Sequence, residues 1–203
     1  MNEMLKMSRI GIVVLILITA FLGCVGGGGD LMSKKVVMVI APDGFRDEEL
    51  FVPKDVLEKG GVSVVIASTQ KEEARGMLGA RVKPDIMISE IDPNEFDGIV
   101  IVGGVGSRTY LWNNTELHDI IREFYKQNKT IAAICISPVV LAHAGVLDQM
   151  EATVFPDTEC IEEIEKCGAT YVREPVVVSD NIITADGPKS ADAFGNEILN
   201  SLK

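Results

Sequence analysis

One cysteine, Cys135, stands between a run typical of a β-strand and a run typical of a helix. Residues 130–134 read Thr-Ile-Ala-Ala-Ile, and Pro138 opens the apolar stretch that follows. A strand that ends at a reactive side chain and turns at once into a helix holds that side chain at a sharp elbow, at the edge of the sheet where open α/β folds keep their sites. The helix N-terminus would favour a thiolate. The alternative interpretation is a structural cysteine, because free cysteines are among the most buried residues.

Two further segments carry groups that complement a thiol. Asp43–Leu50 (DGFRDEEL) follows a predicted strand, and a glycine pair at 103 and 104 ends another. The carboxyl ends of parallel strands meet at one edge, so we expect these segments to lie beside the cysteine. Backbone N–H groups of Gly104 and Ile136 would then stabilise an oxyanion when the thiol attacks a carbonyl. A carboxyl group of Glu48 or Glu49 would face the sulfur, and burial beside a thiolate would keep it protonated.

Strands and helices alternate along the chain and would position these groups. Because the strands are apolar runs rather than alternating patterns, they predict an α/β fold with an open, mostly parallel sheet and helices on both faces. We read 71–81 as an exposed hairpin or loop, and Thr115 as a helix cap. The predicted strands are 35–41, 62–67, 82–89, 99–102, 130–134 and 153–155 with a hairpin at 176–178 and 182–184, and the predicted helices are 47–59, 115–127, 136–144, 157–166 and 188–202.

Composition excludes several classes of function. The formal net charge is −11, and no basic patch for nucleic acid is visible. The chain has only two histidines and no Cys-x-x-Cys pair, so we expect no metal site and no cofactor. Of the histidines, His118 is expected to be solvated, and His143 to be packed or on the surface. Cys160 and Cys167 lie two helical turns apart, roughly 10 Å, which is too far for a disulfide.

Residues 1–32 differ from the rest of the chain. Lys6 and Arg9 precede an apolar run at 10–22, which is short for a spanning helix and suits a signal peptide. Small residues then lead to Cys24 and a polyglycine tether, a pattern that resembles a lipoprotein processing site with Cys24 as the lipidated residue. The alternative is an uncleaved membrane anchor. Either interpretation puts the domain at 33–203 on the extracytoplasmic side of the cell membrane.

From Lys35 to the C-terminus, the chain resembles the PfpI intracellular protease superfamily, which includes the parkinsonism-associated deglycases. The resemblance covers essentially the whole domain, with its blocks in order. The matching blocks are Phe45–Leu50 with Pro53, Asp92–Gly104, Ala132–Cys135 with Pro138, Ala144–Leu147 and, more weakly, Ile183–Pro188.

The resemblance implies a flavodoxin-like three-layer sandwich of the class I glutamine amidotransferase type, usually a homodimer or a larger homo-oligomer. By position, Cys135 corresponds to the nucleophile, Glu49 to its acidic partner and Gly104 to the oxyanion glycine. It also implies a cysteine peptidase, deglycase or glyoxalase-like reaction on peptides or small carbonyl compounds.

This chain departs from the family pattern at the general base. Protease-like members place a histidine directly after the cysteine, where this chain has Ile136, and deglycase-like members place one where it has Phe155. General-base help typically contributes roughly 10²–10⁴-fold, so we expect weak turnover or none. The alternative functions are a non-catalytic redox sensor or ligand-binding domain that uses Cys135, and a chaperone-like module in which Cys135 only packs.

Overall fold

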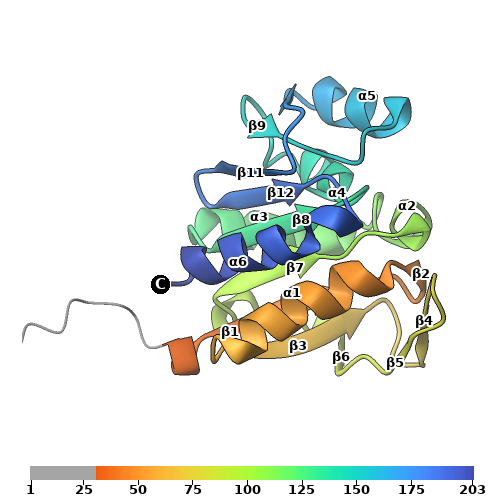
Figure 1. Cartoon of the computed structure of the whole chain (residues 1–203), viewed down its shortest axis with the longest axis vertical. Helices are drawn as coiled ribbons and strands as arrows, with labels where there is room; N and C mark the ends of the chain where they lie inside the picture. The colour runs from red at the N-terminus through yellow and green to blue at the C-terminus, as the bar shows by residue number, and fades with distance from the viewer. Residues whose placement is uncertain (1–30) are drawn as a thin grey trace, which may run out of the picture.

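In the computed structural model, which describes residues 31–203, a seven-stranded sheet crosses the domain (Figure 1). The strand order is β11-β12-β8-β7-β1-β3-β6, and each neighbouring pair is parallel except the antiparallel pair β11–β12. This confirms the predicted α/β fold and the C-terminal hairpin. The strands are β1 Lys35–Val39, β3 Ser63–Ser68, β6 Ile86–Met87, β7 Gly98–Ile101, β8 Thr130–Ile134, β11 Val176–Ser179 and β12 Ile182–Ala185.

Helices cover both faces of this sheet and give three layers (Figure 1). Helices α1 and α6 pack on each other over one face, and α3 lies against β7 and β8 on the other, beside α4. Gly195 lets α1 and α6 approach closely, since a Cβ there would stand 2.9 Å from the Cα of Pro53. The helices are α1 Asp47–Lys59, α2 Val105–Tyr110, α3 Thr115–Lys126, α4 Pro138–His143, α5 Thr158–Lys166 and α6 Ala191–Ser201.

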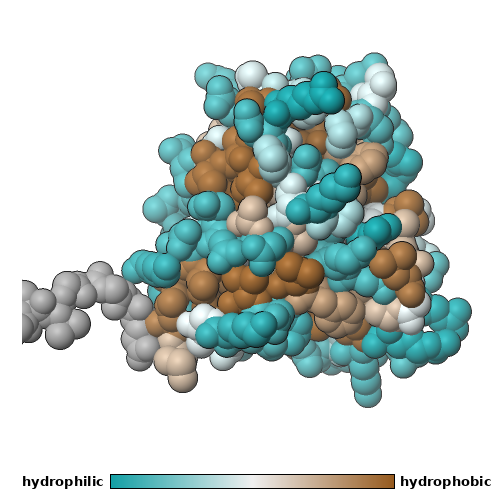
Figure 2. All heavy atoms as spheres, viewed as in Figure 1, coloured by the Kyte–Doolittle hydropathy of each residue, from teal (hydrophilic) through white to brown (hydrophobic). Residues whose placement is uncertain are grey.

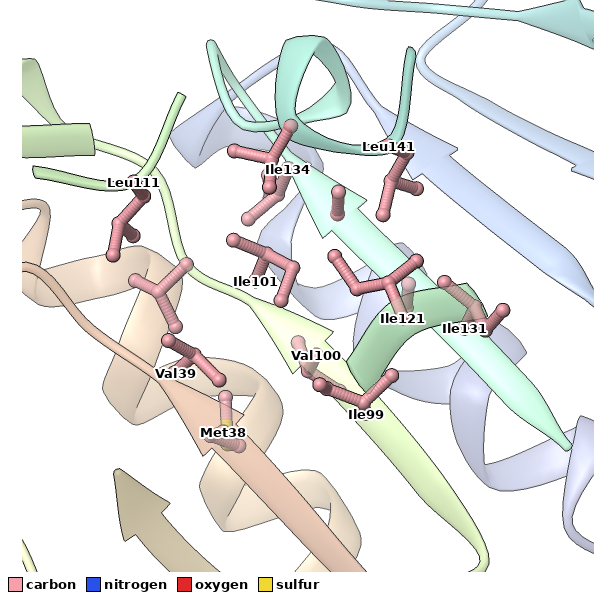
Figure 3. Close-up of a cluster of buried hydrophobic side chains, with 14 of the residues drawn as sticks. Met38, Val39, Ile99, Val100, Ile101, Leu111, Ile121, Ile131, Ile134 and Leu141 are labelled. Atoms are coloured by element: carbon pink, nitrogen blue, oxygen red, sulfur yellow. The ribbon is translucent and has the colours of Figure 1, made fainter. Parts of the chain in front are cut away.

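The core lies around the central strands β1, β7 and β8, which are apolar on both faces. Figure 3 shows side chains of these strands packing with Leu111, Ile121 and Leu141 from the helical side. Val39 is paired in register with Ile101, which in turn pairs with Ala133. This register brings the ends of β1, β7 and β8 to one edge of the sheet, which is the arrangement that the sequence predicts.

Short elements complete the domain. A three-stranded sheet is formed by β2 Asp43–Phe45, β4 Ala74–Gly76 and β5 Arg81–Val82, and a two-stranded sheet by β9 Glu151–Ala152 and β10 Thr170–Tyr171. Four 3-10 turns are present among residues 31–203: η1 Leu31–Ser33, η2 Ile88–Glu90, η3 Pro93–Glu95 and η4 Pro188–Ser190. Segment 71–81, predicted to be an exposed hairpin or loop, contains β4 and forms a hairpin with β5 that pairs with β2.

Several local predictions are wrong. The strand expected at 153–155 is absent, because β9 pairs earlier, at Glu151–Ala152. Thr115 does not cap α3; the side chain of Asn114 accepts the N–H of Leu117 at 2.9 Å. The helix after the elbow begins only at Pro138, because residues 135–137 form a turn.

Other expectations concern parts of the chain away from the elbow. His118, expected to be solvated, is buried in the core. Cys160 and Cys167 are free thiols, as predicted. Within residues 31–203, no helix is long and apolar enough to cross a membrane, and no cluster of three potential metal ligands occurs. The predicted anchor and the lipidation site at Cys24 lie outside the described residues.

Candidate functional site

Cys135 lies directly after β8 with a backbone φ of 64°. A non-glycine residue in this left-handed region costs roughly 1–3 kcal/mol and persists only where its surroundings hold it. Two hydrogen bonds do so here: the N–H of Cys135 donates to the carbonyl of Ala185, and its own carbonyl accepts the N–H of Phe155, both at 2.8 Å. The predicted elbow is therefore present, and it is fixed by strand β12 on one side and by the 153–155 segment on the other.

Glu49, the third residue of α1, is fully buried beside the thiol. Neither of its carboxyl oxygens has a hydrogen-bond partner of normal geometry among the described residues. A Cβ at Gly103 would collide with this carboxyl group and with the Cβ of Cys135, so a glycine is needed there for Glu49 to reach the elbow. Burial raises the pKa of Glu49 to about 7, although the nearby Cys135 thiol and Arg46 act to lower it. The carboxyl group is thus poised to exchange a proton near neutral pH.

The thiol is also held in its neutral form. Burial raises the pKa of Cys135 far above its usual range, and the charge of Glu49 raises it further, while the backbone N–H groups of Gly104 and Ile136 act to lower it. The expectation that the following helix makes this cysteine a thiolate is therefore wrong. Helix α4 starts three residues later, at Pro138, and burial is the largest influence on the pKa of the thiol. The two groups compete for a single negative charge.

Gly104 brings β7 and the start of α1 together. Its φ is 100°, and the position of a Cβ is already occupied by the carbonyl of Gly44 and the N–H of Arg46. That N–H donates to the carbonyl of Gly103 at 3.0 Å. Any side chain at position 104 would push α1 away from the elbow.

A cavity of about 220 Å³ opens in front of these groups. It brings together Cys135, Glu49, Gly104 and Ile136, the four residues that the sequence singled out for this site. The remaining lining residues are Arg46, Met77, Val105, Arg108, Phe155, Asp157 and Pro188.

Some of these lining residues could have been found in the sequence and others could not. Arg46 lies inside the DGFRDEEL segment that was singled out, and Phe155 stands at the family's base position. Met77 and Arg108 carried no signal, because the hairpin and the six-residue helix α2 that hold them are too short to leave a periodic pattern.

Neither histidine of the chain lines this cavity; both lie behind the elbow. His118 Nε2 and His143 Nδ1 each lie 2.9 Å from the carbonyl oxygen of Trp112, whose indole N–H donates to the carbonyl of Ile136 at 2.9 Å. His143 Nε2 also lies 3.0 Å from a carboxylate oxygen of Glu163. Both nitrogens of His143 thus lie within hydrogen-bond distance of an oxygen. These residues support the elbow and do not supply its base.

Comparisons with known proteins agree with this architecture. The family described as DJ-1/PfpI matches residues 34–201. The chain belongs to the DJ-1/PfpI family. The resemblance stated from the sequence is thereby confirmed, as is the flavodoxin-like fold.

Relatives of this chain carry different names. An uncharacterized protein of Methanocaldococcus jannaschii is 45% identical over 97% of this chain and 98% of its own length. A putative cysteine protease of Bacillus subtilis, YraA, is 34% identical over 85% of this chain and 100% of its own. A deglycase of Thermococcus kodakarensis is 30% identical over 82% and 99%. Among solved structures, a ThiJ/PfpI domain protein from Brachyspira murdochii superposes with a TM-score of 0.79 at 33% identity, covering 83% of this chain and 95% of that one.

Proposed function

We propose that this DJ-1/PfpI domain is a slow, deglycase- or glyoxalase-like enzyme that adds the thiol of Cys135 to small carbonyl compounds. The observation that carries the proposal is the strained Cys135 beside a buried Glu49, neither of whose carboxyl oxygens has a hydrogen-bond partner of normal geometry within the described part of the chain. Backbone strain and an unsatisfied buried acid each cost stability, and such costs concentrate at functional sites.

The two side chains supply a complete proton cycle. The carboxylate of Glu49 accepts the proton of the Cys135 thiol as the sulfur attacks the carbonyl carbon. A carbon–sulfur bond forms, and the π electron pair of the carbonyl moves to its oxygen. The N–H groups of Gly104 and Ile136 stabilise that oxygen until it takes the proton back from Glu49, leaving a neutral hemithioacetal.

The size of the cavity favours a small substrate over a peptide. About 220 Å³ is less than the volume of typical sites for drug-sized ligands. Ile136, Phe155 and Pro188 wall it with apolar surface, whereas a peptide would need an open groove. This observation supports the deglycase-like reaction over the proteolytic one suggested by the name of the Bacillus relative.

This mechanism is tested by comparing the rate of Cys135 alkylation with the rate of methylglyoxal turnover. Replacing Glu49 with Gln removes a negative charge beside the sulfur, so alkylation of Cys135 by iodoacetamide at pH 8 should become faster. The same change removes the proton carrier, so consumption of methylglyoxal should fall by roughly 10²–10⁴-fold. Cys135→Ser should abolish turnover, and Cys167→Ser, at a half-buried thiol outside the cavity, should not. Parallel changes in alkylation and turnover in Glu49→Gln would overturn the assigned role of Glu49.

Redox sensing is the second candidate function, and the same unpartnered carboxyl group favours it. A protonated Glu49 would donate a hydrogen bond to a sulfinate formed at Cys135. Intact mass after limiting peroxide, compared with Cys135→Ser, tests this function. If Cys135 is no more reactive than Cys160 or Cys167, both the enzyme and the sensor are excluded, and a packing role remains.

We also propose that the domain is tethered on the extracytoplasmic side of the cell membrane, through lipidated Cys24 or through an uncleaved N-terminal helix. The charge and apolar pattern of residues 1–30 supports this location. Membrane fractionation and acyl labelling of Cys24→Ala distinguish the two forms. A lipid anchor requires the variant to lose its label, and a spanning helix requires it to stay with the membrane. Recovery of the full-length chain in the soluble fraction would exclude both.

We also propose that the domain forms a homodimer or a larger homo-oligomer. Hydrophobic residues gather between α1 and α6 (Figure 2), where Phe51 is partly exposed beside a groove that also includes Val52 and Leu199. Light scattering on the domain tests the assembly, and Phe51→Glu should shift it toward monomer if this face is used. A monomeric wild-type domain would refute it.

A further inference from the structure

Two arginines stand in the wall of the Cys135 cavity, although the chain as a whole is acidic. Arg46 and Arg108 line the cavity together with the elbow and Glu49. A net charge of −11 would repel an anion from most of the surface. Two guanidinium groups at one small cavity therefore place hydrogen-bond donors for an anion next to the nucleophile.

Arg108 is held by Trp112, but its ion pair with Glu159 can be exchanged for a ligand. Its guanidinium lies over the ring of Trp112, 4.9 Å from the ring centroid, and one of its nitrogens lies 2.6 Å from a carboxylate oxygen of Glu159. The side chains of this ion pair are 45% and 57% exposed. Exposed pairs of this kind contribute only about 0–1 kcal/mol. An anionic ligand group in the cavity would therefore compete well for Arg108, while the indole keeps the guanidinium at the cavity mouth.

Arg46 is held more firmly by its carboxylate partner than Arg108 is. Its Nε and Nη2 bind the two oxygens of Glu48 at 2.7 and 3.0 Å, a bidentate pair that leaves Nη1 without a bond to that carboxylate. Its charge acts on Glu49 and Cys135 as well. Arg46 is therefore largely occupied by Glu48, and Arg108, with its single exposed ion pair, is the group able to bind a ligand directly.

Acidic groups stand near both guanidinium groups, and Asp157 also lines the cavity. One carboxylate oxygen of Asp157 is occupied at the start of α5, where it accepts the N–H of Cys160 at 2.7 Å. Burial raises the pKa of Glu49 to about 7, so near neutral pH this carboxyl group is neutral for much of the time. The hydrogen-bond donors that line the cavity are the two guanidinium groups and the backbone N–H groups of the elbow.

We propose that the cavity selects small carbonyl compounds that carry a carboxylate, with Arg108 as the residue that determines this specificity. The carboxylate binds the Arg108 guanidinium, and the carbonyl carbon lies over the sulfur of Cys135. The inference rests on the proposed function, because it assigns a substrate class to the same nucleophile. A 2-oxo acid of two or three carbons has both groups and fits a cavity of this volume.

Paired alkylating agents measure the field at the sulfur independently of turnover. Iodoacetate and iodoacetamide react alike: the thiolate attacks the methylene carbon, a carbon–sulfur bond forms and iodide leaves. Only iodoacetate is an anion. The ratio of its rate constant to that of iodoacetamide cancels any change in the thiolate fraction. For Cys135 of the wild-type domain this ratio should exceed that of Cys167 in the same chain, and Arg108→Gln should lower it about tenfold.

A matched control separates a local effect from a change in net charge. Arg81 is also an exposed arginine paired with a glutamate, Glu73, but it lies outside the cavity. Arg81→Gln should leave the ratio unchanged. Equal ratios in the wild-type protein and Arg108→Gln, with Cys135 still reactive, would overturn the inference and leave the proposed function intact.

Substrate binding gives a second readout that does not need a reactive thiol. In Cys135→Ser, titration with pyruvate should shift the amide resonances of Gly104 and Ile136, and adding Arg108→Gln should weaken this binding about tenfold. With active protein, glyoxylate should be preferred over methylglyoxal in kcat/KM, and Arg108→Gln should reverse the preference. If Cys135 is inert while pyruvate binds in an Arg108-dependent manner, the proposed function fails but the carboxylate site stands. If pyruvate does not bind, the inference fails.

Discussion

Phe155 stands at the position where a general base would be able to accept the proton of the Cys135 thiol. Its N–H donates to the carbonyl of Cys135 at 2.8 Å, and its side chain lines the cavity with 40% of its surface exposed. The ring thus lines the same cavity as Cys135 and does not fill the core. Among the described residues that line this cavity, Glu49 is the group whose pKa burial raises to about 7. A cysteine–glutamate pair without an imidazole can complete a proton cycle, but it starts from a thiol that burial keeps neutral.

Replacing Phe155 with His should therefore increase activity. An imidazole at this position would accept the thiol proton without placing a second negative charge beside the sulfur. We expect methylglyoxal turnover at pH 7.5 to rise by at least tenfold, toward the low end of the usual contribution of a general base. Steady-state kinetics with Phe155→Leu as the control separate the base from the mere loss of the ring. An equal gain in the leucine variant, or no gain in the histidine variant, would mean that the ring and not the missing base sets the rate.

At the scale of elements, the long ones were predictable and the short ones were not. The apolar runs at β1, β7 and β8 predicted buried strands, and the glycines after Lys59 correctly marked the C-terminal end of α1. The strands β2, β4 and β5 have two or three residues each, too few for a period to show. They exist because of contacts between distant segments, and they are what places Met77 at the mouth of the cavity.

The sequence predicts only those site residues whose positions follow from the order of the parallel strands. Once β7 and β8 are neighbours, Gly104 and Cys135 must meet at one edge, and Glu49 follows from the short connection after β1. The arginines in the cavity and the histidines behind it depend on side-chain packing. His118 shows this well: Glu116 and Asp119 suggested an exposed position, yet the carbonyl of Trp112 holds its ring inside.

Asp47 is the residue on which the small sheet depends. Its carboxylate accepts the N–H groups of Leu78 and Ala80 at 2.9 and 2.8 Å and so holds the β4–β5 hairpin against the start of α1. Asp47→Ala should lower the free energy of unfolding by about 1–3 kcal/mol, because both N–H groups lose a charged acceptor. It should also speed hydrogen exchange at these two amides.

Asp55→Ala is the matched control for this change. Asp55 lies on the same helix, but its carboxylate makes only an exposed ion pair with Lys59. Its loss should barely change stability. Urea denaturation of both variants gives the comparison. Equal costs for the two variants would mean that the hairpin is held by other contacts.

At the scale of the whole molecule, the buried carboxyl group of the candidate site lowers the free energy of unfolding. This cost should depend on pH. Unfolded Glu49 titrates near 4.5, whereas burial raises its pKa in the folded protein to about 7. Between these values the folded state binds more protons than the unfolded state, so stability falls as pH rises. Below pH 4.5 both states are protonated and nothing is lost. Above about pH 7 the full cost of a buried carboxylate, about 3 kcal/mol, is present.

Glu49→Gln should remove this fall, because a neutral amide titrates in neither state. Urea denaturation of wild-type protein and variant from pH 4 to 9 should give free energies of unfolding that diverge above pH 4.5, with the variant more stable at pH 8. Glu48→Gln is the control on the neighbouring residue: the hydrogen-bonded Arg46 lowers the pKa of Glu48, so its effect on stability has the opposite sign. Parallel profiles for wild type and Glu49→Gln would show that Glu49 is solvated in the folded protein, and the proton cycle assigned to Glu49 and Cys135 would lose its basis.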